Sequence, residues 1–464
     1  MVLLQFLTVR LAMVNGIGRI KRREFLKVIA AGAAAPVVVP TSALGRAGIT
    51  APSDRITMGL VGCGQHGMGW NLDRMFSNPD QQVVAVCDVD SRHLAEAKQK
   101  VNAYYSAKSG RDYRCGTHGD FRDLVNRKDI DAVAVATPDH WHVLVALMAI
   151  KSGKHVISEK PLTLTVREGR ILADAAERSG LVFQTASENR SVETYVRMAE
   201  LIQEGVFGRI RHMKVLLPPS NRHREVLDTK IETPPTELNY EMWQGPAPRM
   251  PYCASRVHFN FRWNLAYSGG IITDWGAHMI DLAHWATGNE RTGPVEVEGT
   301  GDFPPRDGVW NTAATFKLRY RYASGLTMEL FTDAPGLKFE GTQGWLLTRG
   351  WLGPLTSSKP ELLATTLPTR QRLRRPRTDG NGGEHMDFTD AIREGRPAYA
   401  PAEIGHRTIT VAHIGNIAMQ LGRKLRWDPS VERFVDDAEA NAILSREQRA
   451  PWKLENVDGW LNVG

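Results

Sequence analysis

The sequence predicts an α/β domain on a parallel, doubly wound sheet, followed by an α+β domain with an open, mostly antiparallel sheet. From Ile56 onward, short apolar runs alternate with amphipathic stretches, which is typical of repeated βαβ units. From about Val295 to Thr348, β-rich runs follow one another at short intervals, and such runs pair antiparallel. With 464 residues and 42% apolar content, the chain can bury the cores of two or three domains.

The expected elements follow in chain order. In the first domain we expect strands at 56–62, 82–88, 131–136, 154–158 and 181–185, with helices near 66–76, 91–103, 141–152 and 165–179. A helix near 191–204 and a strand at 209–217 then precede a Pro-rich stretch, 218–251, whose length and irregularity indicate a functional loop. Later strands are expected at 313–322, 325–331 and 344–348. We therefore expect domains at 54–188 and 189–428 and a wrapping segment at 429–464.

The first 46 residues are expected to lie outside the fold. A basic run from Lys21 to Lys27, with Arg22 and Arg23 adjacent, precedes an apolar stretch from Val28 to Pro40, and small residues follow. This pattern resembles a twin-arginine export signal and predicts a periplasmic location. The apolar stretch is shorter than the ~20 residues that span a bilayer, so no stable membrane span is expected after processing. The alternative is a chance basic and apolar stretch.

Charge and cysteines exclude several classes of protein. The net charge of +7 is spread over many short runs, and only 370–377 concentrates it, which we interpret as a solvated loop. Nucleic acid is therefore not an expected partner. The four cysteines form no CxxC pair and no metal-ligand spacing, so free thiols are expected rather than a zinc ribbon or a disulfide scaffold: Cys63, Cys87, Cys115 and Cys253.

A glycine motif directly after the first strand predicts a Rossmann dinucleotide site. Gly62 permits the tight turn, Gly64 lets the backbone approach a pyrophosphate, and Gly67 lets helix and strand pack closely. Gln65 and His66 lie in the same turn. A purely structural glycine turn is the alternative.

Asp88 ends the second strand and is the expected ribose ligand. Its carboxylate would repel a 2′-phosphate, which favours NAD. NADP stays possible because Arg92 lies nearby.

Two further strand ends are expected at the same edge of the sheet. Thr137 and Pro138 would line the cofactor cleft, because open α/β sheets bind ligands beyond the carboxyl ends of their strands. Glu159 and Lys160 end a later strand, so Lys160 is expected beside the nicotinamide, with its pKa lowered by burial and by neighbouring positive charge. No role is assigned to His140 and His142, because two histidines at the start of a helix are at least as often capping and packing residues as ligands.

A second constellation begins with Gly269 and Gly270, which lead into a helix. Asp274 and His278 are four residues apart and share a helical face, so the carboxylate can orient the imidazole while the other ring nitrogen meets a substrate. Asp281 lies on the same face. Two alternatives stay open here: a divalent metal site, and a capping Asp beside a buried histidine. The favoured interpretation includes no metal.

In their order along the chain, these motifs resemble the Gfo/Idh/MocA oxidoreductases, from about Ile56 to Leu425. Shorter stretches resemble exported members of that family: Phe183-Gln184-Thr185, Trp243-Gln244-Gly245-Pro246, Tyr267-Ser268-Gly269-Gly270 and Asp274-Trp275-Gly276-Ala277-His278. The resemblance implies that Lys160 and His278 form the proton-handling pair, with Asp274 beside them. Polar groups near aromatic rings suit a sugar with one apolar face, and we expect substrate contacts from Asn189, Arg190, Arg262, Trp263 and Tyr267.

The expected reaction is NAD(P)-dependent oxidation of a hydroxyl group on a sugar, sugar derivative or cyclic polyol. An exported enzyme has no recycled nicotinamide pool, so the cofactor should stay tightly bound. Two chemistries meet that condition: a ping-pong oxidoreductase, which we favour because no added acid is evident, and a glycoside hydrolase that oxidises its sugar transiently. A non-catalytic sugar-binding protein is the third possibility. An open sheet face in the second domain favours a homo-oligomer.

Overall fold

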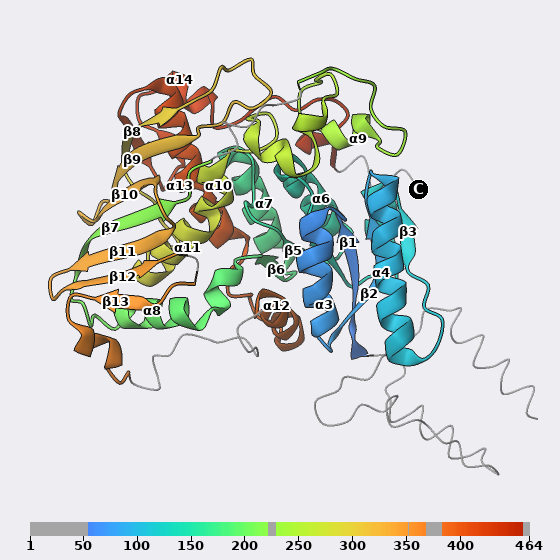
Figure 1. Ribbon diagram of the computed structural model, residues 1–464, viewed down its shortest axis with the longest axis horizontal. Coiled ribbons are helices and arrows are strands. Elements are labelled where there is room, and N and C mark those ends of the chain that lie inside the picture. Colours follow the sequence, from blue (N-terminus) through green and yellow to red (C-terminus); the bar gives the residue numbers. More distant parts are fainter. Residues whose placement is uncertain (1–53, 221–228, 351, 368–382, 458–464) are drawn as a thin grey trace, which may run out of the picture. The chain divides into compact units, whose positions relative to one another are not determined.

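The computed structural model describes residues 54–220, 229–350, 352–367 and 383–457 (Figure 1). The expected export signal at 1–46 and the basic stretch at 370–377 lie outside these residues. Among the helices of the described ranges, none is long and apolar enough to cross a membrane.

The first sheet is parallel, six-stranded and ordered β3-β2-β1-β4-β5-β6. Its strands are β1 (Ile56–Val61), β2 (Gln81–Cys87), β3 (Gly116–His118), β4 (Ala132–Val135), β5 (His155–Ser158) and β6 (Phe183–Thr185). The chain builds outward in one direction from β1 and then in the other from β4. The carboxyl ends of β1 and β4 therefore flank the switch point where such sheets bind ligands. The prediction of a parallel sheet is confirmed.

Helices cover this sheet on both faces (Figure 1). They are η3 (Gly67–Asn71), which continues into α3 (Leu72–Ser77), then α4 (Ser91–Ser109), α5 (Phe121–Val125), α6 (Asp139–Lys151) and α7 (Val166–Ser179). Asp90 caps α4 by accepting a hydrogen bond from the Arg92 amide, and Thr165 and Glu168 form a capping box on α7. These caps fix where the helices begin, directly after the strand ends that border the ligand edge.

The second sheet has nine strands in the order β13-β12-β11-β7-β10-β9-β8-β14-β15. Its strands are β7 (Ile210–Leu217), β8 (Glu296–Asp302), β9 (Thr315–Arg321), β10 (Thr327–Thr332), β11 (Gly336–Gly341), β12 (Trp345–Arg349), β13 (Leu355–Ser357), β14 (Leu425–Asp428) and β15 (Arg433–Phe434). All pairings are antiparallel except that of β7 with β10. The prediction of a mostly antiparallel second sheet is confirmed.

One face of the second sheet is buried beneath helices. In β9, exposed and buried residues alternate strictly, and Phe316, Leu318 and Tyr320 point into the core. The covering helices include α8 (Glu193–Gln203), α11 (Gly276–Thr287), which follows the short α10 (Ile271–Asp274), and α13 (Ala402–Leu421).

Helix α13 also packs on α7 of the first half, so the two halves share buried contacts. Helix α12 (Gly383–Glu394) packs on β5 and β6. The remaining helices are short: η4 (Glu188–Ser191), α9 (Tyr240–Gln244), η6 (Ala254–Arg256), η7 (His258–Trp263), η8 (Pro360–Ala364), α14 (Ala438–Ala442) and η10 (Leu454–Asn456).

Candidate active site

The glycine turn leaves an opening at the end of β1. Gly62 has φ +97°, a conformation that favours glycine, and a Cβ on Gly67 would lie 2.0 Å from the Gly62 carbonyl oxygen. A Cβ on Gly64 would meet nothing within 4 Å. Two of the glycines thus make the turn and its packing possible, and the third leaves free space above the helix N-terminus. This is the arrangement that a diphosphate requires.

A cavity of about 580 Å³ extends from this turn, within the size range of small-molecule sites. Of the predicted cofactor residues, all but Gly67 line it: Gly62, Gly64, Gln65, His66, Asp88, Thr137, Pro138, Glu159 and Lys160. Apolar walls come from both halves of the chain, including Phe121, Trp141, Met242 and Phe261. The open glycine, the acid at the end of β2 and the lysine at the end of β5 fit a dinucleotide.

Asp88 is held against the cavity wall by backbone amides. Its carboxylate oxygens accept hydrogen bonds from the Cys63 amide at 2.6 Å and the Asp90 amide at 2.8 Å. Burial raises the pKa of this carboxyl, although both amides favour its charged form. Each carboxylate oxygen has a further lone pair with which to accept a hydrogen bond from a ribose hydroxyl.

Lys160 and Asp274 form an ion pair across the two halves of the chain. The Lys160 Nζ donates to Asp274 Oδ1 at 2.8 Å, and both side chains are largely buried. Burial lowers the pKa of Lys160, but the negative charges of Asp274 and Glu188 and the hydrogen bond to Asp274 together outweigh burial, so the pKa lies above its ordinary value. The expected lowering of this pKa is therefore wrong for the protein alone, because the sequence did not place Asp274 against the ammonium. The pKa of Asp274 lies well below its ordinary value, since Lys160 and Arg262 outweigh its burial.

His278 lies beside this ion pair. Burial and the positive charge of Lys160 hold the pKa of His278 well below its ordinary value, so the ring is neutral at pH 7. A neutral imidazole can accept a proton, and an ammonium fixed by a carboxylate can stabilise negative charge. The structure therefore gives the two proposed proton-handling residues different protonation states.

A buried carboxyl next to His278 was not foreseen from the sequence. Glu188 Oε1 lies 3.5 Å from His278 Nδ1. Burial and the nearby Glu159 charge raise the pKa of Glu188 well above its ordinary value. Glu188 follows β6 as Lys160 follows β5. The rule that placed the lysine at the ligand edge could therefore have found this acid too.

Glu159, which precedes Lys160 in the chain, is held by two polar side chains. Its Oε1 accepts from Asn71 Nδ2 at 2.8 Å and lies 3.0 Å from His66 Nε2. These partners outweigh burial and lower the pKa of Glu159 to about 2, so it is ionised. The pKa values of the two neighbouring carboxyls Glu159 and Glu188 are thus shifted in opposite directions.

The five predicted substrate residues are distributed unevenly. Arg262 lines the cavity, with Nε 3.6 Å from Asp274 Oδ1 and its guanidinium over the Phe259 and Phe261 rings. Asn189 is buried, and its amide oxygen and nitrogen have no hydrogen-bond partner among the described residues. Both residues remain predicted substrate contacts.

The other three candidates, like Asn189, are not among the residues that line the cavity. The Arg190 guanidinium binds Asp281 and Glu290, Tyr267 packs on Trp243, and Trp263 belongs to the core of the second half. These positions do not test whether the three residues contact a substrate.

Asp274, His278 and Asp281 were the residues of the possible metal site, and both of its carboxylates bind side-chain cations. Asp274 binds Lys160, and both Asp281 oxygens accept from Arg190.

His140, His142 and the cysteines pack in the interior. His140 contacts the Trp243 carbonyl, and His142 contacts the carbonyls of Thr137 and Pro161. The four cysteines are buried and form no disulfide with one another.

The fold and the cavity define a Rossmann-type dinucleotide-binding protein with an open-sheet second half. Residues 56–187 match the family model described as "Oxidoreductase family, NAD-binding Rossmann fold". Residues 224–454 match the model of the same family described as "Oxidoreductase family, C-terminal alpha/beta domain". The chain belongs to the Gfo/Idh/MocA oxidoreductase family, whose members are NAD-dependent oxidoreductases or family 109 glycosidases.

Curated relatives carry the second of these names. The chain is 31% identical over 212 residues to "Glycosyl hydrolase family 109 protein 2" of Shewanella sp. (strain ANA-3), covering 41% of this chain and 44% of that protein. It is 30% identical over 208 residues to a family 109 protein of Shewanella pealeana, covering 42% and 45%. The chain thus spans less than half the length of the curated relatives it matches.

Solved structures share the fold. GenD2 from gentamicin A biosynthesis, in complex with NAD, superimposes with a TM-score of 0.59 at 19% identity over 81% of this chain and 97% of that one. The WlbA dehydrogenase of Bordetella pertussis, with NADH and UDP-GlcNAcA, gives 0.58 at 18% over 81% and 99%. Levoglucosan dehydrogenase, with NADH and levoglucosan, gives 0.58 at 18% over 80% and 99%.

Proposed function

We propose that this chain oxidises a hydroxyl-bearing carbon of a sugar, sugar derivative or cyclic polyol, using a tightly bound NAD. The observation that carries the proposal is the Lys160–Asp274 ion pair beside a neutral His278, near a cavity that fits a dinucleotide. Sugar-bound dehydrogenases of the same fold support the substrate class.

The roles of the residues follow from their protonation states. When bound, the nicotinamide accepts the hydride that leaves the hydroxyl carbon. His278 takes the hydroxyl proton, and the electron pair of the O–H bond becomes the second bond of the carbonyl. The Lys160 ammonium, fixed by Asp274, donates a hydrogen bond to that oxygen and stabilises its negative charge as the proton leaves. Arg262 and Asn189 are the proposed substrate contacts.

Contacts over the end of β2 support a cofactor that stays bound. The Ser91 amide donates to the Glu237 carbonyl at 2.9 Å, the Asn239 amide donates to the Val89 carbonyl at 2.9 Å, and Leu238 lines the cavity. The segment around Leu238 therefore covers the edge where Asp88 would hold the adenosine ribose. The Asp88 carboxylate favours NAD over NADP, because it repels a 2′-phosphate.

Glu188 favours a second candidate, a glycoside hydrolase that oxidises its sugar transiently. Cleavage of a glycosidic bond needs an acid for the leaving oxygen, and a carboxyl whose pKa is raised by burial, 3.5 Å from His278 Nδ1, can supply it. The family 109 names of the curated relatives agree with this candidate. In that cycle the hydride returns to the sugar, so no net oxidation occurs.

We further propose export through the twin-arginine route and self-association. The first rests on the basic and apolar pattern in residues 1–46. The second rests on the outer face of the nine-stranded sheet, where β9 leaves Thr315, Lys317, Arg319 and Arg321 exposed. Light scattering on the purified protein measures the oligomeric state, and fractionation of the source cells measures the location.

One experiment on the purified full chain tests the function. The denatured protein is expected to release a nicotinamide that is identified by its spectrum. Sugars and nitrophenyl glycosides are then tested for reduction of the bound cofactor and for nitrophenol release, with Lys160→Met as the inactive variant and Lys214→Met, on β7, as its control. Reduction without nitrophenol supports the oxidoreductase, and nitrophenol without net reduction supports the hydrolase. Neither signal with any compound, with cofactor present, contradicts both.

A further inference from the structure

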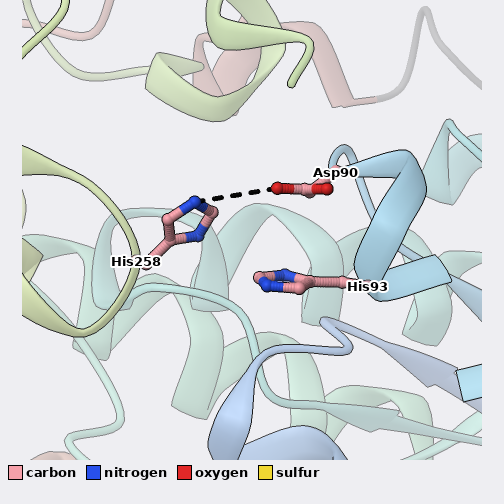
Figure 2. A group of neighbouring side chains, drawn as sticks. All are labelled: Asp90, His93 and His258. Atoms are coloured by element: carbon pink, nitrogen blue, oxygen red, sulfur yellow. Dashed lines mark ion pairs between the residues drawn. The ribbon is translucent and has the colours of Figure 1, made fainter. Parts of the chain in front are cut away.

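A second cluster of polar side chains lies at the start of α4, away from Lys160. Figure 2 shows Asp90, His93 and His258 facing one another, with the dashed line marking the contact of His258 with Asp90. Asp90 and His93 belong to the Rossmann half, and His258 is the first residue of η7. All three line the cavity. The proposed reaction uses none of them.

The distances within the cluster suit a divalent cation. One ligand atom from each residue lies within 4.8 Å of the other two, and His258 Nε2 is 3.7 Å from Asp90 Oδ2. Around zinc, with bonds of about 2.0–2.2 Å, tetrahedral ligand atoms lie about 3.3–3.5 Å apart. Small side-chain rotations therefore close the cluster around an ion. Among the described residues, no other group of three His, Cys, Asp or Glu meets the same distance criterion.

The backbone at His258 gives an independent observation. His258 has φ +53°, a left-handed conformation that is uncommon for residues other than glycine and that asparagine, aspartate and histidine adopt more often than the rest. Such strain persists where the surroundings fix it, and it is concentrated at binding sites. Here it directs an imidazole from the second half toward the start of α4, and the His93 and His258 ring centroids lie 4.9 Å apart.

Arg92 is the competing partner of Asp90. Its Nη2 donates to Asp90 Oδ2 at 3.1 Å, and its side chain is 55% exposed. An exposed arginine contributes little to such a pair and can turn into solvent when a cation arrives. Asp90 also keeps its capping bond through Oδ1, which accepts from the Arg92 amide at 2.9 Å. One carboxylate oxygen therefore remains for an ion.

We propose that Asp90, His93 and His258 form a binding site for a divalent transition-metal ion, of which zinc is the probe, that ties η7 to the start of α4. Two imidazoles and one carboxylate are a common ligand set for such ions, and a water completes it. The ion joins the two halves at the wall of the cavity. The proposal does not depend on the identity of the sugar or on the reaction.

The test is zinc titration of the untagged, chelator-treated full chain, followed by calorimetry and thermal unfolding. His258→Asn removes the ligand and keeps a residue that tolerates positive φ, and Asp90→Asn keeps the helix cap. His93→Gln removes the third ligand, and His212→Gln, on β7, is the matched control.

We expect one zinc per chain and a higher Tm with zinc. Each ligand variant should bind about 100-fold more weakly, and the control should match the unaltered protein. Arg92→Gln should bind more tightly, because the competing cation is gone. The proposal is overturned if the unaltered protein takes up no zinc, or if His93→Gln and His258→Asn bind it as well as the control. Cobalt(II) absorption reports the ligand geometry independently in any variant whose Tm without metal is unchanged.

Discussion

Two buried ion pairs use aspartates that are seven residues apart, and their surroundings differ. Asp274, at the end of α10, pairs with Lys160 through one short bond, and Lys160 lines the cavity. Asp281, within α11, accepts two bonds of 2.7 Å from Arg190. Arg190 also binds Glu290 at 2.6 Å and packs over the Trp285 ring. The Lys160–Asp274 pair borders a cavity, whereas the Arg190–Asp281 pair is surrounded by other protein groups.

The difference separates a pair that can act on a ligand from one that holds the fold. An ammonium has three donors, so Lys160 can keep its bond to Asp274 and still meet a substrate oxygen. The Arg190 guanidinium uses its Nε and both Nη atoms on protein acceptors. Removing the Lys160 cation should therefore act mainly on the rate of reaction. Removing the Arg190 cation should act mainly on the free energy of unfolding.

The largest expected effect is on activity, in Lys160→Met. Loss of the ammonium removes the charge that stabilises the substrate oxygen and should lower kcat about 10³- to 10⁴-fold, equivalent to about 4–5.5 kcal/mol. The Tm should also fall, because Asp274 keeps its buried charge, but less than in Arg190→Met, since the Arg262 Nε, 3.6 Å from Asp274 Oδ1, still faces that carboxylate. Steady-state rates with the best compound of the sugar panel measure the first effect, and thermal unfolding measures the second. Activity within tenfold of the unaltered protein would falsify the assigned role.

Arg190→Met should reverse this pattern. It leaves the buried Asp281 and the partly exposed Glu290 without their cation, and breaking a buried pair such as Arg190–Asp281 costs about 3–5 kcal/mol. Urea unfolding measures the loss. Cofactor content per folded chain should stay equal to that of the unaltered protein. If stability is unchanged and substrate affinity falls, Arg190 is a substrate contact as the sequence suggested.

Glu384 sharpens the comparison, because burial acts on it more strongly than its partners do. It accepts from Trp70 Nε1 at 3.2 Å, and burial raises its pKa to about 7. The folded state therefore holds the proton more tightly than the unfolded chain, whose glutamates titrate near 4.3. The stabilising contribution is complete below that pH and is lost as the pH rises through about 7.

Glu384→Gln keeps an acceptor for Trp70 and removes the titration. It should be more stable than the unaltered protein at pH 8 by about 3–4 kcal/mol, with the difference disappearing near pH 4. Urea unfolding at both pH values measures this. Glu361→Gln, at an exposed position in η8, is the control. A constant difference across the pH range would exclude a titrating Glu384.

The first sheet and the positions of Lys160 and Asp274 could be predicted from the sequence because local signals carry them. Apolar runs mark the strands, and the carboxyl ends of parallel strands meet at one edge. β3 (Gly116–His118) has no such pattern. It is a strand only because Ala85, Val86 and Cys87 of β2 pair with it. That pairing joins residues about 30 positions apart, which periodicity cannot detect.

The electrostatics of the site could not be predicted in the same way. The pKa of Lys160 depends on Asp274, 114 positions away, and the place of Arg190 depends on Asp281. Burial alone predicts a lowered pKa for Lys160, which is the wrong direction. Negative charges that are distant in the sequence together outweigh burial. Residue type and spacing therefore located the groups, whereas the fold decided which of them face a ligand.

Asp88 is a third case, a buried carboxylate held by amides, and the smallest effect is expected there. Asp88→Ala should reduce the preference for NAD over NADP by about tenfold, or about 1.4 kcal/mol, because the repulsion of a 2′-phosphate is lost. The ratio of the two affinities is the measurement, since loss of the bond to the Cys63 amide weakens both alike. Asp123→Ala, exposed on α5, should leave the ratio unchanged. An unchanged ratio in Asp88→Ala would mean that this carboxylate only holds the glycine turn. Asp88 would then be a structural residue, as Arg190 is, and not a ligand-facing residue such as Lys160.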